Sequence, residues 1–295
     1  MNEFKSYHPI VNFIYFFAVI GFSMVFMHPL CLAASLAAAL AYSLLLGGKR
    51  VLRFELSCLL PLMLLSVVIS PVFNHEGATI LAYLPDGNPL TLESIAYSAA
   101  AACMIASVIC WFSCLNKIMT SDKLIYLFGK IIPSLSLILS MTLRLVPRFA
   151  AQLGEVRAAR RCIGRDITDG GLVCRMKNGI RILSVMITWS LENAIDTADS
   201  MKSRGYGLPG RTAFSVFRFD GRDAAALACI GALVLYILAA AAFGGFYFRY
   251  FPYITRPEIT PLSISAMSAY LLLCGCPLII EALEERRWKK SESKI

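Results

Sequence analysis

Charged residues are scarce in this sequence of 295 residues. Asp, Glu, Lys and Arg make up 16% of it and hydrophobic residues 58%, whereas charged residues reach roughly a quarter of a soluble globular protein. This composition excludes an ordinary soluble protein and indicates a lipid bilayer. The apolar residues also gather in blocks close to the ~20 residues that cross a bilayer as a helix. The sequence therefore predicts an all-α polytopic membrane protein.

Groups that carry out catalysis are also lacking. The three histidines, His8, His28 and His75, are too few to build a histidine metal site or a Ser-His-Asp triad easily. The G-x-x-x-x-G-K-[ST] motif is missing, which excludes ATP binding by the P-loop route. A G-x-G-x-x-G match at 205–210 follows an expected helix instead of a strand, so it does not indicate a dinucleotide site. We expect no catalytic residue, no metal and no cofactor of the chain's own.

Ionisable residues are rare in the apolar blocks, where only Glu55, Glu93 and Glu281 lie at block ends. A proton- or ion-coupled carrier needs such groups near the middle of the membrane. A self-contained carrier is therefore disfavoured, and the energy for any transport is expected from a partner.

The ten cysteines do not indicate a metal site, because no histidine or carboxylate is spaced to complete one. Eight of them lie in or at the ends of apolar blocks, and we expect these to pack as small buried hydrophobes. They are Cys31, Cys58, Cys103, Cys110, Cys114, Cys229, Cys274 and Cys276.

Six candidate membrane spans can be placed in the sequence, at about 11–27, 30–46, 55–73, 94–115, 224–247 and 261–281. With six crossings both termini lie on one side. Every Lys and Arg except Arg249 and Arg256 then falls on the side of the termini, and the positive-inside rule makes that side cytoplasmic. We expect N-terminal spans in 1–115, a cytoplasmic segment in 116–223, and C-terminal spans with a basic tail in 224–295.

The expected cytoplasmic segment holds 17 of the 28 Lys and Arg residues. A short apolar run, 134–146, lies between Pro133 and Pro147, two residues that interrupt helices, and predicts a buried or membrane-surface helix. An amphipathic stretch follows to about Arg161. After a glycine-rich break, a second helix is predicted at 172–204, with Gly205 as its stop.

Two parts of this segment carry a family resemblance. The sequence Ser203-Arg204-Gly205-Tyr206 is similar to the second Ala-Arg-Gly coupling motif in the transmembrane T component of energy-coupling factor (ECF) transporters, with serine in place of the common alanine. Upstream, Leu143-Arg144-Leu145-Val146-Pro147 followed by Glu155 resembles the stretch that leads to the family's first coupling motif. The resemblance is specific over about 121–211 and only hydropathic elsewhere.

The resemblance implies a pair of coupling helices whose tips each insert an arginine into an ATPase subunit. Arg204 would be the second coupling arginine, flanked by Ser203 and Gly205. The first motif departs from the family pattern, so Arg161 is favoured for its arginine, with Arg160 and Arg165 as competitors. Arg144, Pro147, Glu155 and Tyr206 would shape the helices.

The resemblance further implies a bacterial inner-membrane protein that is not itself an enzyme. Its partners would be two ABC-type ATPases, which bind the ATP, and a membrane-embedded S component that binds a vitamin, cofactor precursor or metal ion. The basic segment does not indicate nucleic acid, because the positive-inside rule accounts for its charge. The alternative is an integral membrane enzyme or sensor whose basic segment binds phosphate-bearing lipids.

Overall fold

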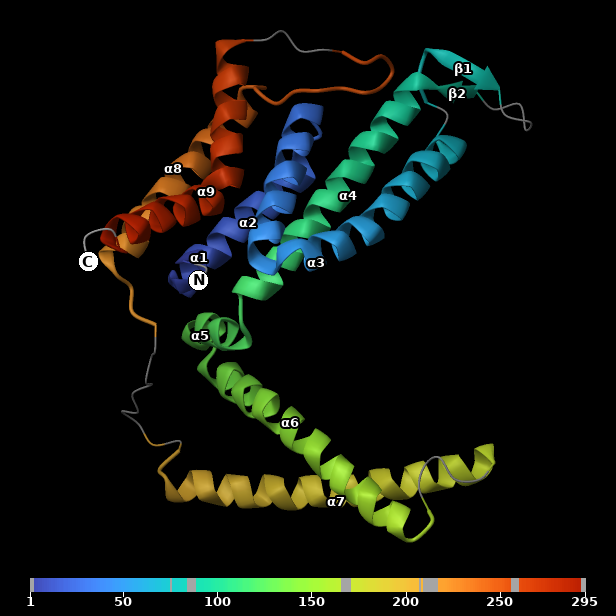
Figure 1. Cartoon of the computed structure of the whole chain (residues 1–295), viewed down its shortest axis with the longest axis vertical. Helices are drawn as coiled ribbons and strands as arrows, with labels where there is room; N and C mark the ends of the chain where they lie inside the picture. Colours follow the sequence, from blue (N-terminus) through green and yellow to red (C-terminus); the bar gives the residue numbers. More distant parts are fainter. Residues whose placement is uncertain are drawn as a thin grey trace. The chain divides into compact units, whose positions relative to one another are not determined.

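The computed structural model describes residues 3–74, 76–83, 89–165, 171–206, 208, 217–255 and 260–292. Two compact units divide the chain (Figure 1). Residues Met1–Leu124 and Phe217–Ile295 form the first, here called the spanning unit. Residues Ile125–Val216 form the second, here called the crossed-helix unit.

The spanning unit is built mainly of helices. In chain order its elements are α1 (Glu3–Ser6), α2 (Pro9–Val25), α3 (Pro29–Phe73), β1 (Ile80–Tyr83), β2 (Pro89–Thr91), α4 (Leu92–Ile118), α8 (Gly221–Ala242) and α9 (Pro261–Glu292). The crossed-helix unit contains α6 (Pro133–Cys162) and α7 (Leu172–Ser203), and α5 (Ser121–Ile131) leads from one unit to the other.

Four helices in the described part of the chain are long and apolar enough to cross a membrane: α3, α4, α8 and α9. The shorter helix α2 is also apolar. The prediction of an all-α polytopic membrane protein is confirmed. The six expected spans fall on five helices because α3 contains two of them, 30–46 and 55–73.

A backbone break separates the two parts of α3. Gly48 has φ +67° and ψ −173°, values outside the helical region, and a positive φ of this size favours glycine. The carboxylate of Glu55, beyond the break, accepts hydrogen bonds of 2.6 Å from the hydroxyls of Ser43, before the break, and Ser113 on α4. Glu55 is 6% exposed. Its hydrogen bonds therefore fasten both parts of α3 to each other and to α4.

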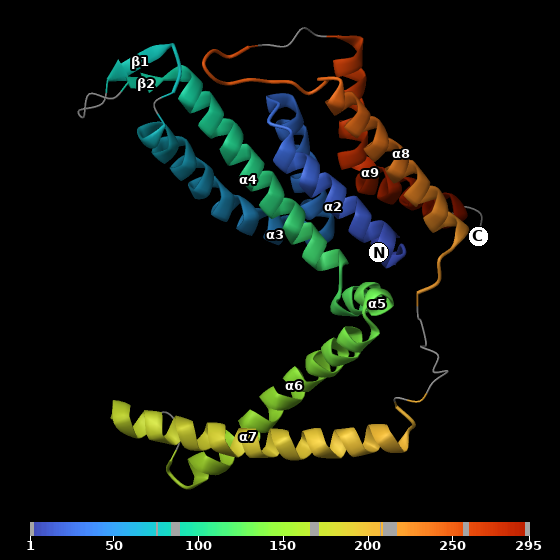
Figure 2. The same cartoon turned by 180° about the vertical axis from the view of Figure 1, so that it is seen from behind.

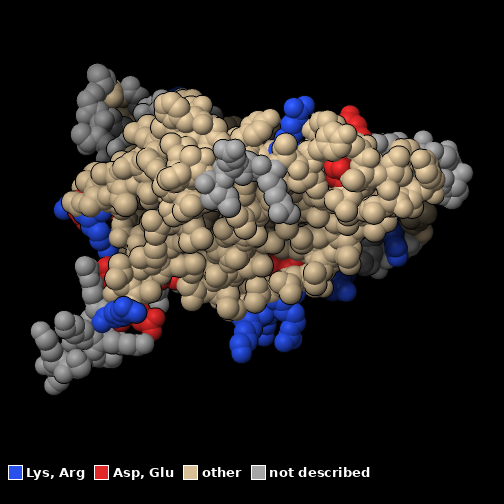
Figure 3. All heavy atoms as spheres, turned by 90° about the horizontal axis from the view of Figure 1, so that it is seen from above, with Lys and Arg blue, Asp and Glu red and all other residues tan. Residues whose placement is uncertain are grey.

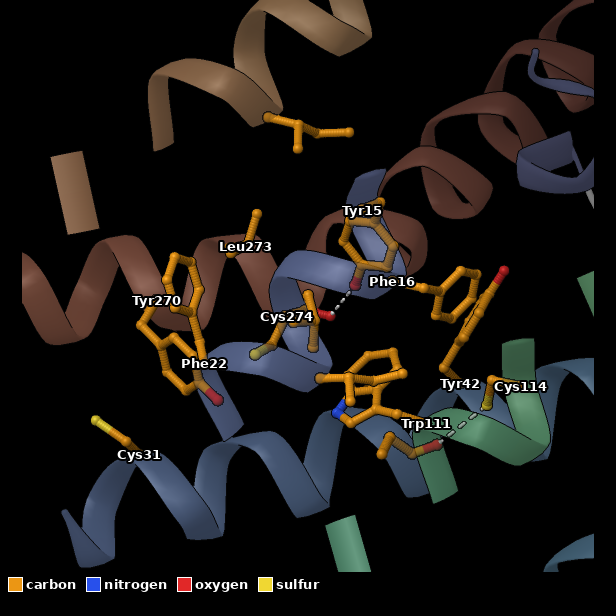
Figure 4. Packing of buried hydrophobic residues seen from close by; sticks show 14 of the residues in the cluster. Tyr15, Phe16, Phe22, Cys31, Tyr42, Trp111, Cys114, Tyr270, Leu273 and Cys274 are labelled. Atoms are coloured by element: carbon orange, nitrogen blue, oxygen red, sulfur yellow. Dashed lines mark hydrogen bonds between the residues drawn. The ribbon is translucent and has the colours of Figure 1, made fainter. Parts of the chain in front are cut away.

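Aromatic side chains fill the centre of the spanning unit, where Tyr15 and Phe16 of α2 meet Trp111 of α4 (Figure 4). Their polar atoms are satisfied within the core: the Tyr15 hydroxyl donates to the Cys274 carbonyl at 3.1 Å and the Trp111 indole to the Ser35 hydroxyl at 3.0 Å. In a bilayer, helices associate through such packing and hydrogen bonds instead of the hydrophobic effect.

Apolar residues also cover the outside of the chain. In Figure 3 most of the visible surface is neither acidic nor basic. The cysteines of the apolar blocks include both buried and exposed side chains. The prediction of buried packing holds for Cys31, Cys110, Cys114 and Cys274, whereas it is wrong for Cys58 and Cys229, which are exposed. Both exposed cysteines lie on spanning helices, where apolar side chains can face lipid tails as readily as protein.

Two His-Pro pairs start helices. His8 and His28 are the N-caps of α2 and α3, and each imidazole Nδ1 accepts a hydrogen bond of 3.3 Å from the backbone N–H two residues later. The following prolines occupy the first helical position, where a missing N–H has no cost. Both histidines are therefore structural. Between α3 and α4, β1 and β2 form an antiparallel hairpin, which the sequence analysis did not predict.

The N-terminal segment makes hydrogen bonds to the start of α5 and to the start of α8, the two places where the chain leaves and re-enters the spanning unit. The ammonium of Lys123, on α5, donates to the Lys5 carbonyl at 2.6 Å and, with the Asn12 amide oxygen turned toward it, to Asn12 at 2.8 Å. The backbone N–H of His8 donates to the carboxylate of Asp223, on α8, at 3.1 Å. Lys123 is 4% exposed, and burial lowers its pKa to about 8.

Candidate functional site

The crossed-helix unit consists of two long helices that cross near the middle of α7 (Figures 1 and 2). The rings of Phe149 on α6 and Trp189 on α7 lie 5.4 Å apart, edge to face. The Arg148 guanidinium lies 5.6 Å from the Trp189 ring. Ile182 and Met186 of α7 are buried on the same side of that helix as Trp189. Aromatic and cation–π contacts thus define the crossing point.

Helix α6 runs without a break from Pro133 to Cys162. The prediction that Pro147 interrupts it is wrong. Proline removes only one helical hydrogen bond, the one that would reach the carbonyl of Leu143. Both residues are exposed, so the freed carbonyl can be solvated. Two other expected residues of this helix, Arg144 and Glu155, are also exposed.

Helix α7 ends at Ser203, one residue before the predicted end at Arg204. The Gly205 N–H donates to the Lys202 carbonyl at 3.0 Å, and the Tyr206 N–H donates to the Met201 carbonyl at 3.1 Å. Gly205 has φ +74°. These two hydrogen bonds with a left-handed glycine form a Schellman motif. The motif fixes Arg204 as the last residue before the turn, with its side chain exposed.

Helix α6 ends in the same motif. The Gly164 N–H donates to the Arg161 carbonyl at 3.0 Å, and the Arg165 N–H donates to the Arg160 carbonyl at 3.1 Å. Gly164 has φ +67°. The residue before this glycine, Ile163, has φ −96° and ψ 5°, close to the φ −86° and ψ 6° of Arg204.

The shared motif aligns the two helix ends residue by residue. Ile163 occupies in α6 the position that Arg204 occupies in α7, and Arg161 corresponds to Lys202. The two competing arginines of the first cluster, Arg160 and Arg165, correspond to Met201 and Tyr206. None of the three candidate arginines therefore stands where Arg204 stands.

The two ends differ in chemistry. The end of α7 presents Ser203 and Arg204, both exposed, beside a half-buried Tyr206. The end of α6 presents Ile163, 72% exposed, between the exposed Arg161 and Arg165. Arg160 is half-buried, and its Nε donates to the Arg165 carbonyl at 3.5 Å, which draws this side chain back over its own cap.

Both ends lie at a similar distance from the crossing. At about 1.5 Å per residue, Cys162 lies ~20 Å along α6 from Phe149, and Ser203 lies ~21 Å along α7 from Trp189. The tips lie at separate ends of the crossed pair (Figure 1). Among the described residues, no group of three or more His, Cys, Asp or Glu could hold a metal ion.

A second apolar stripe on α7 lies on a different face from the buried Ile182 and Met186, and the sequence analysis did not predict it. It is exposed over most of the helix, and its members recur at three- and four-residue spacing, which was the available signal. They are Met176, Ile180, Leu183, Ile187 and Leu191.

Comparison with known proteins identifies relatives. No protein-family model matches the chain. The "Energy-coupling factor transporter transmembrane protein EcfT" of Lactobacillus helveticus (strain DPC 4571) is 36% identical over 107 residues, 36% of this chain and 39% of that protein. The protein of that name from Lactococcus lactis subsp. cremoris (strain MG1363) is 32% identical over 105 residues, 35% of this chain and 39% of its own length.

A longer alignment is found with EcfT of Listeria innocua serovar 6a (strain ATCC BAA-680 / CLIP 11262), 27% identical over 233 residues, 73% of this chain and 86% of that protein. The chain thus spans about two fifths of the length of the first two relatives and most of the third. The resemblance to the transmembrane component of ECF transporters, inferred from the motifs, is confirmed.

Proposed function

We propose that this relative of the EcfT transmembrane proteins is the T component of an ECF-type importer and that its α6 and α7 ends dock on two cytoplasmic ATPase subunits. In this function the ATPases bind and hydrolyse ATP, and the chain transmits their movement without a catalytic site of its own. The α7 end carries the proposal: a Schellman motif holds an exposed arginine at a rigid helix end.

The chemistry of the α7 end suits insertion into a protein groove. Arg204 offers a planar guanidinium with five donors, which pairs well with carboxylates and carbonyls. Its neighbours, Ser203 and Gly205, are small, so that the helix end can approach another surface closely. The left-handed glycine fixes where the helix stops, and thereby limits the orientations open to the arginine.

A membrane-embedded S component is the proposed second kind of partner. The exposed apolar stripe of α7 supports this, because contiguous apolar surface of this length outside a bilayer span indicates a protein or membrane contact. The imported substrate would be a vitamin, a cofactor precursor or a metal ion, bound by the S component. The family resemblance implies a bacterial inner membrane, and the positive-inside rule favours both termini in the cytoplasm.

The test is purification of the complex from its native membrane in mild detergent. We expect ATPase subunits to co-elute with the wild-type protein and to be lost with Arg204→Glu. Arg181→Glu is the matched control, since Arg181 is an exposed arginine in the middle of α7, and it should keep the ATPases. A wild-type protein that elutes without ATPases contradicts the proposal.

Binding to lipid vesicles separates this function from the lipid-binding alternative. If the chain has no specific lipid site at Arg204, the purified protein should bind anionic vesicles through its general positive charge. Arg204→Glu and Arg181→Glu should then weaken this binding equally. A selective loss with Arg204→Glu would favour a lipid-headgroup enzyme or sensor.

A further inference from the structure

The two helix ends share a backbone geometry but present different side chains at the same place. Hydrogen bonds of 3.0 and 3.1 Å close both Schellman motifs, and both stop glycines have φ near +70°. Equivalent positions in the two motifs therefore project their side chains in equivalent directions from the helix end. At the position before the glycine, α7 projects Arg204 and α6 projects Ile163.

We infer that the α6 end docks through Ile163, which enters an apolar pocket of its ATPase partner, with Arg161 and Arg165 on an acidic rim of that pocket. This inference rests on the proposed function and names the chemistry of one docking partner. It follows that the two ATPase grooves differ: the α7 groove accepts a guanidinium, whereas the α6 groove accepts an aliphatic side chain.

Exposure supports an aliphatic anchor. Ile163 is 72% exposed and directly follows Cys162, the last residue of a long helix. Its φ of −96° is open to any residue, so the backbone does not require isoleucine here. Burial of such a side chain in a partner is favourable, whereas its exposure on the free chain contributes nothing to folding.

The positions of the neighbouring arginines also support Ile163 as the anchor. Arg160 is half-buried and hydrogen-bonded to the Arg165 carbonyl, which leaves it poorly placed to enter a groove. Arg161 lies one residue inside the helix end, at the position of Lys202 in α7. Hot spots in interfaces have an anchor in a desolvated pocket and charges at the rim, and the arrangement of Ile163 with Arg161 and Arg165 matches this.

Substitutions at Ile163 test the inference in the purified complex. Ile163→Arg restores at this end the side chain that α7 carries, yet we expect at least a tenfold loss of ATPase binding, because the pocket would receive an unpaired charge. Ile163→Val should weaken binding by no more than about fourfold, since it removes only one methylene. The control is Val146→Arg, an exposed apolar position on α6 far from its end and outside the α7 stripe, and it should retain the ATPases.

A double exchange tests whether the ends are interchangeable. Ile163→Arg combined with Arg204→Ile should bind no better than the weaker single variant. Binding restored by the exchange, or wild-type binding by Ile163→Arg alone, would overturn the inference and return Arg161 to the coupling role. Absence of ATPases from the wild-type complex would instead overturn both the proposed function and the inference.

Cross-linking identifies the two grooves directly. Cys162 is exposed next to Ile163 and corresponds to Ser203 next to Arg204. A thiol-directed cross-linker on native Cys162, compared with Ser203→Cys in a Cys162→Ser background, should label different peptides of the ATPases. The Cys162 peptide should be apolar with acidic flanks. Labelling of the same groove peptide from both positions would contradict the inference.

Discussion

If the end of α7 docks as proposed, its left-handed glycine should control how well the chain binds ATPase subunits. Gly205 has φ +74°, a conformation that costs an L-residue with a β-carbon about 1–2 kcal/mol. A β-carbon built there would also lie 3.2 Å from Leu208 Cδ1, a tight but adjustable contact. In Gly205→Ala we expect the Schellman turn to open and Arg204 to lose its fixed position.

The expected effect follows from that cost. If the turn must close before docking, 1–2 kcal/mol corresponds to about 5- to 30-fold weaker ATPase binding. Amide hydrogen exchange gives a second measurement, because the Gly205 and Tyr206 amides are bonded to the Lys202 and Met201 carbonyls. Both amides should exchange faster in the variant by a similar factor.

Gly205→Asn separates conformation from crowding. Asparagine also carries a β-carbon but tolerates the left-handed region far better than alanine, so it should lie much closer to wild type in both assays. Equal losses in Gly205→Ala and Gly205→Asn would mean that crowding against the partner is responsible. Wild-type binding by Gly205→Ala would refute the reasoning that the turn positions Arg204.

Three further predictions concern packing and protonation. Burial lowers the pKa of Lys123 to about 8, so between pH 8 and the ordinary lysine pKa the unfolded chain binds more protons than the folded chain. The melting temperature of wild type relative to Lys123→Met should therefore rise from pH 8 to pH 10. A difference in melting temperature that does not change with pH would contradict this. Trp189→Ala removes the ring at the helix crossing and should destabilise the α6–α7 packing by about 1–2 kcal/mol, seen as faster limited proteolysis of that unit, while Leu191→Ala, at an exposed position, should leave it unchanged. Glu55→Leu deprives two serine hydroxyls of their acceptor and should lower the free energy of unfolding by about 1–3 kcal/mol, measured by thermal unfolding in detergent, whereas Glu55→Gln should lose less.

The sequence predicted those features that depend on length and composition. Membrane spans were visible because a bilayer demands a minimum apolar length. The end of α7 was placed within one residue because glycine marks a helix stop with a defined backbone requirement. Other features depend on context. The continuity of α6 through Pro147 was missed, since an exposed helix tolerates one lost hydrogen bond. The sequence also did not predict that His8 and His28 cap helices.

The end of α6 illustrates a different limit of prediction from sequence. Among the three arginines near Gly164, the sequence reading favoured Arg161. The hydrogen bonds of the two helix ends show which positions correspond, and Ile163 corresponds to Arg204. The glycines alone carried this signal, because aligning Gly164 with Gly205 gives the same correspondence. Whether Arg161, Arg160 or Arg165 contributes to coupling stays a prediction.

Helices α6 and α7 cross at a point that lies at nearly equal distances from their C-terminal ends. The Phe149–Trp189 contact serves as the pivot, and each arm measures ~20 Å at the helical rise per residue. With such arms, a change of 10° in the crossing angle displaces one tip relative to the other by roughly 3.5 Å. A partner that moves both tips would therefore change the crossing angle, and the contacts of Trp189 with Phe149 and Arg148 would have to accommodate each change.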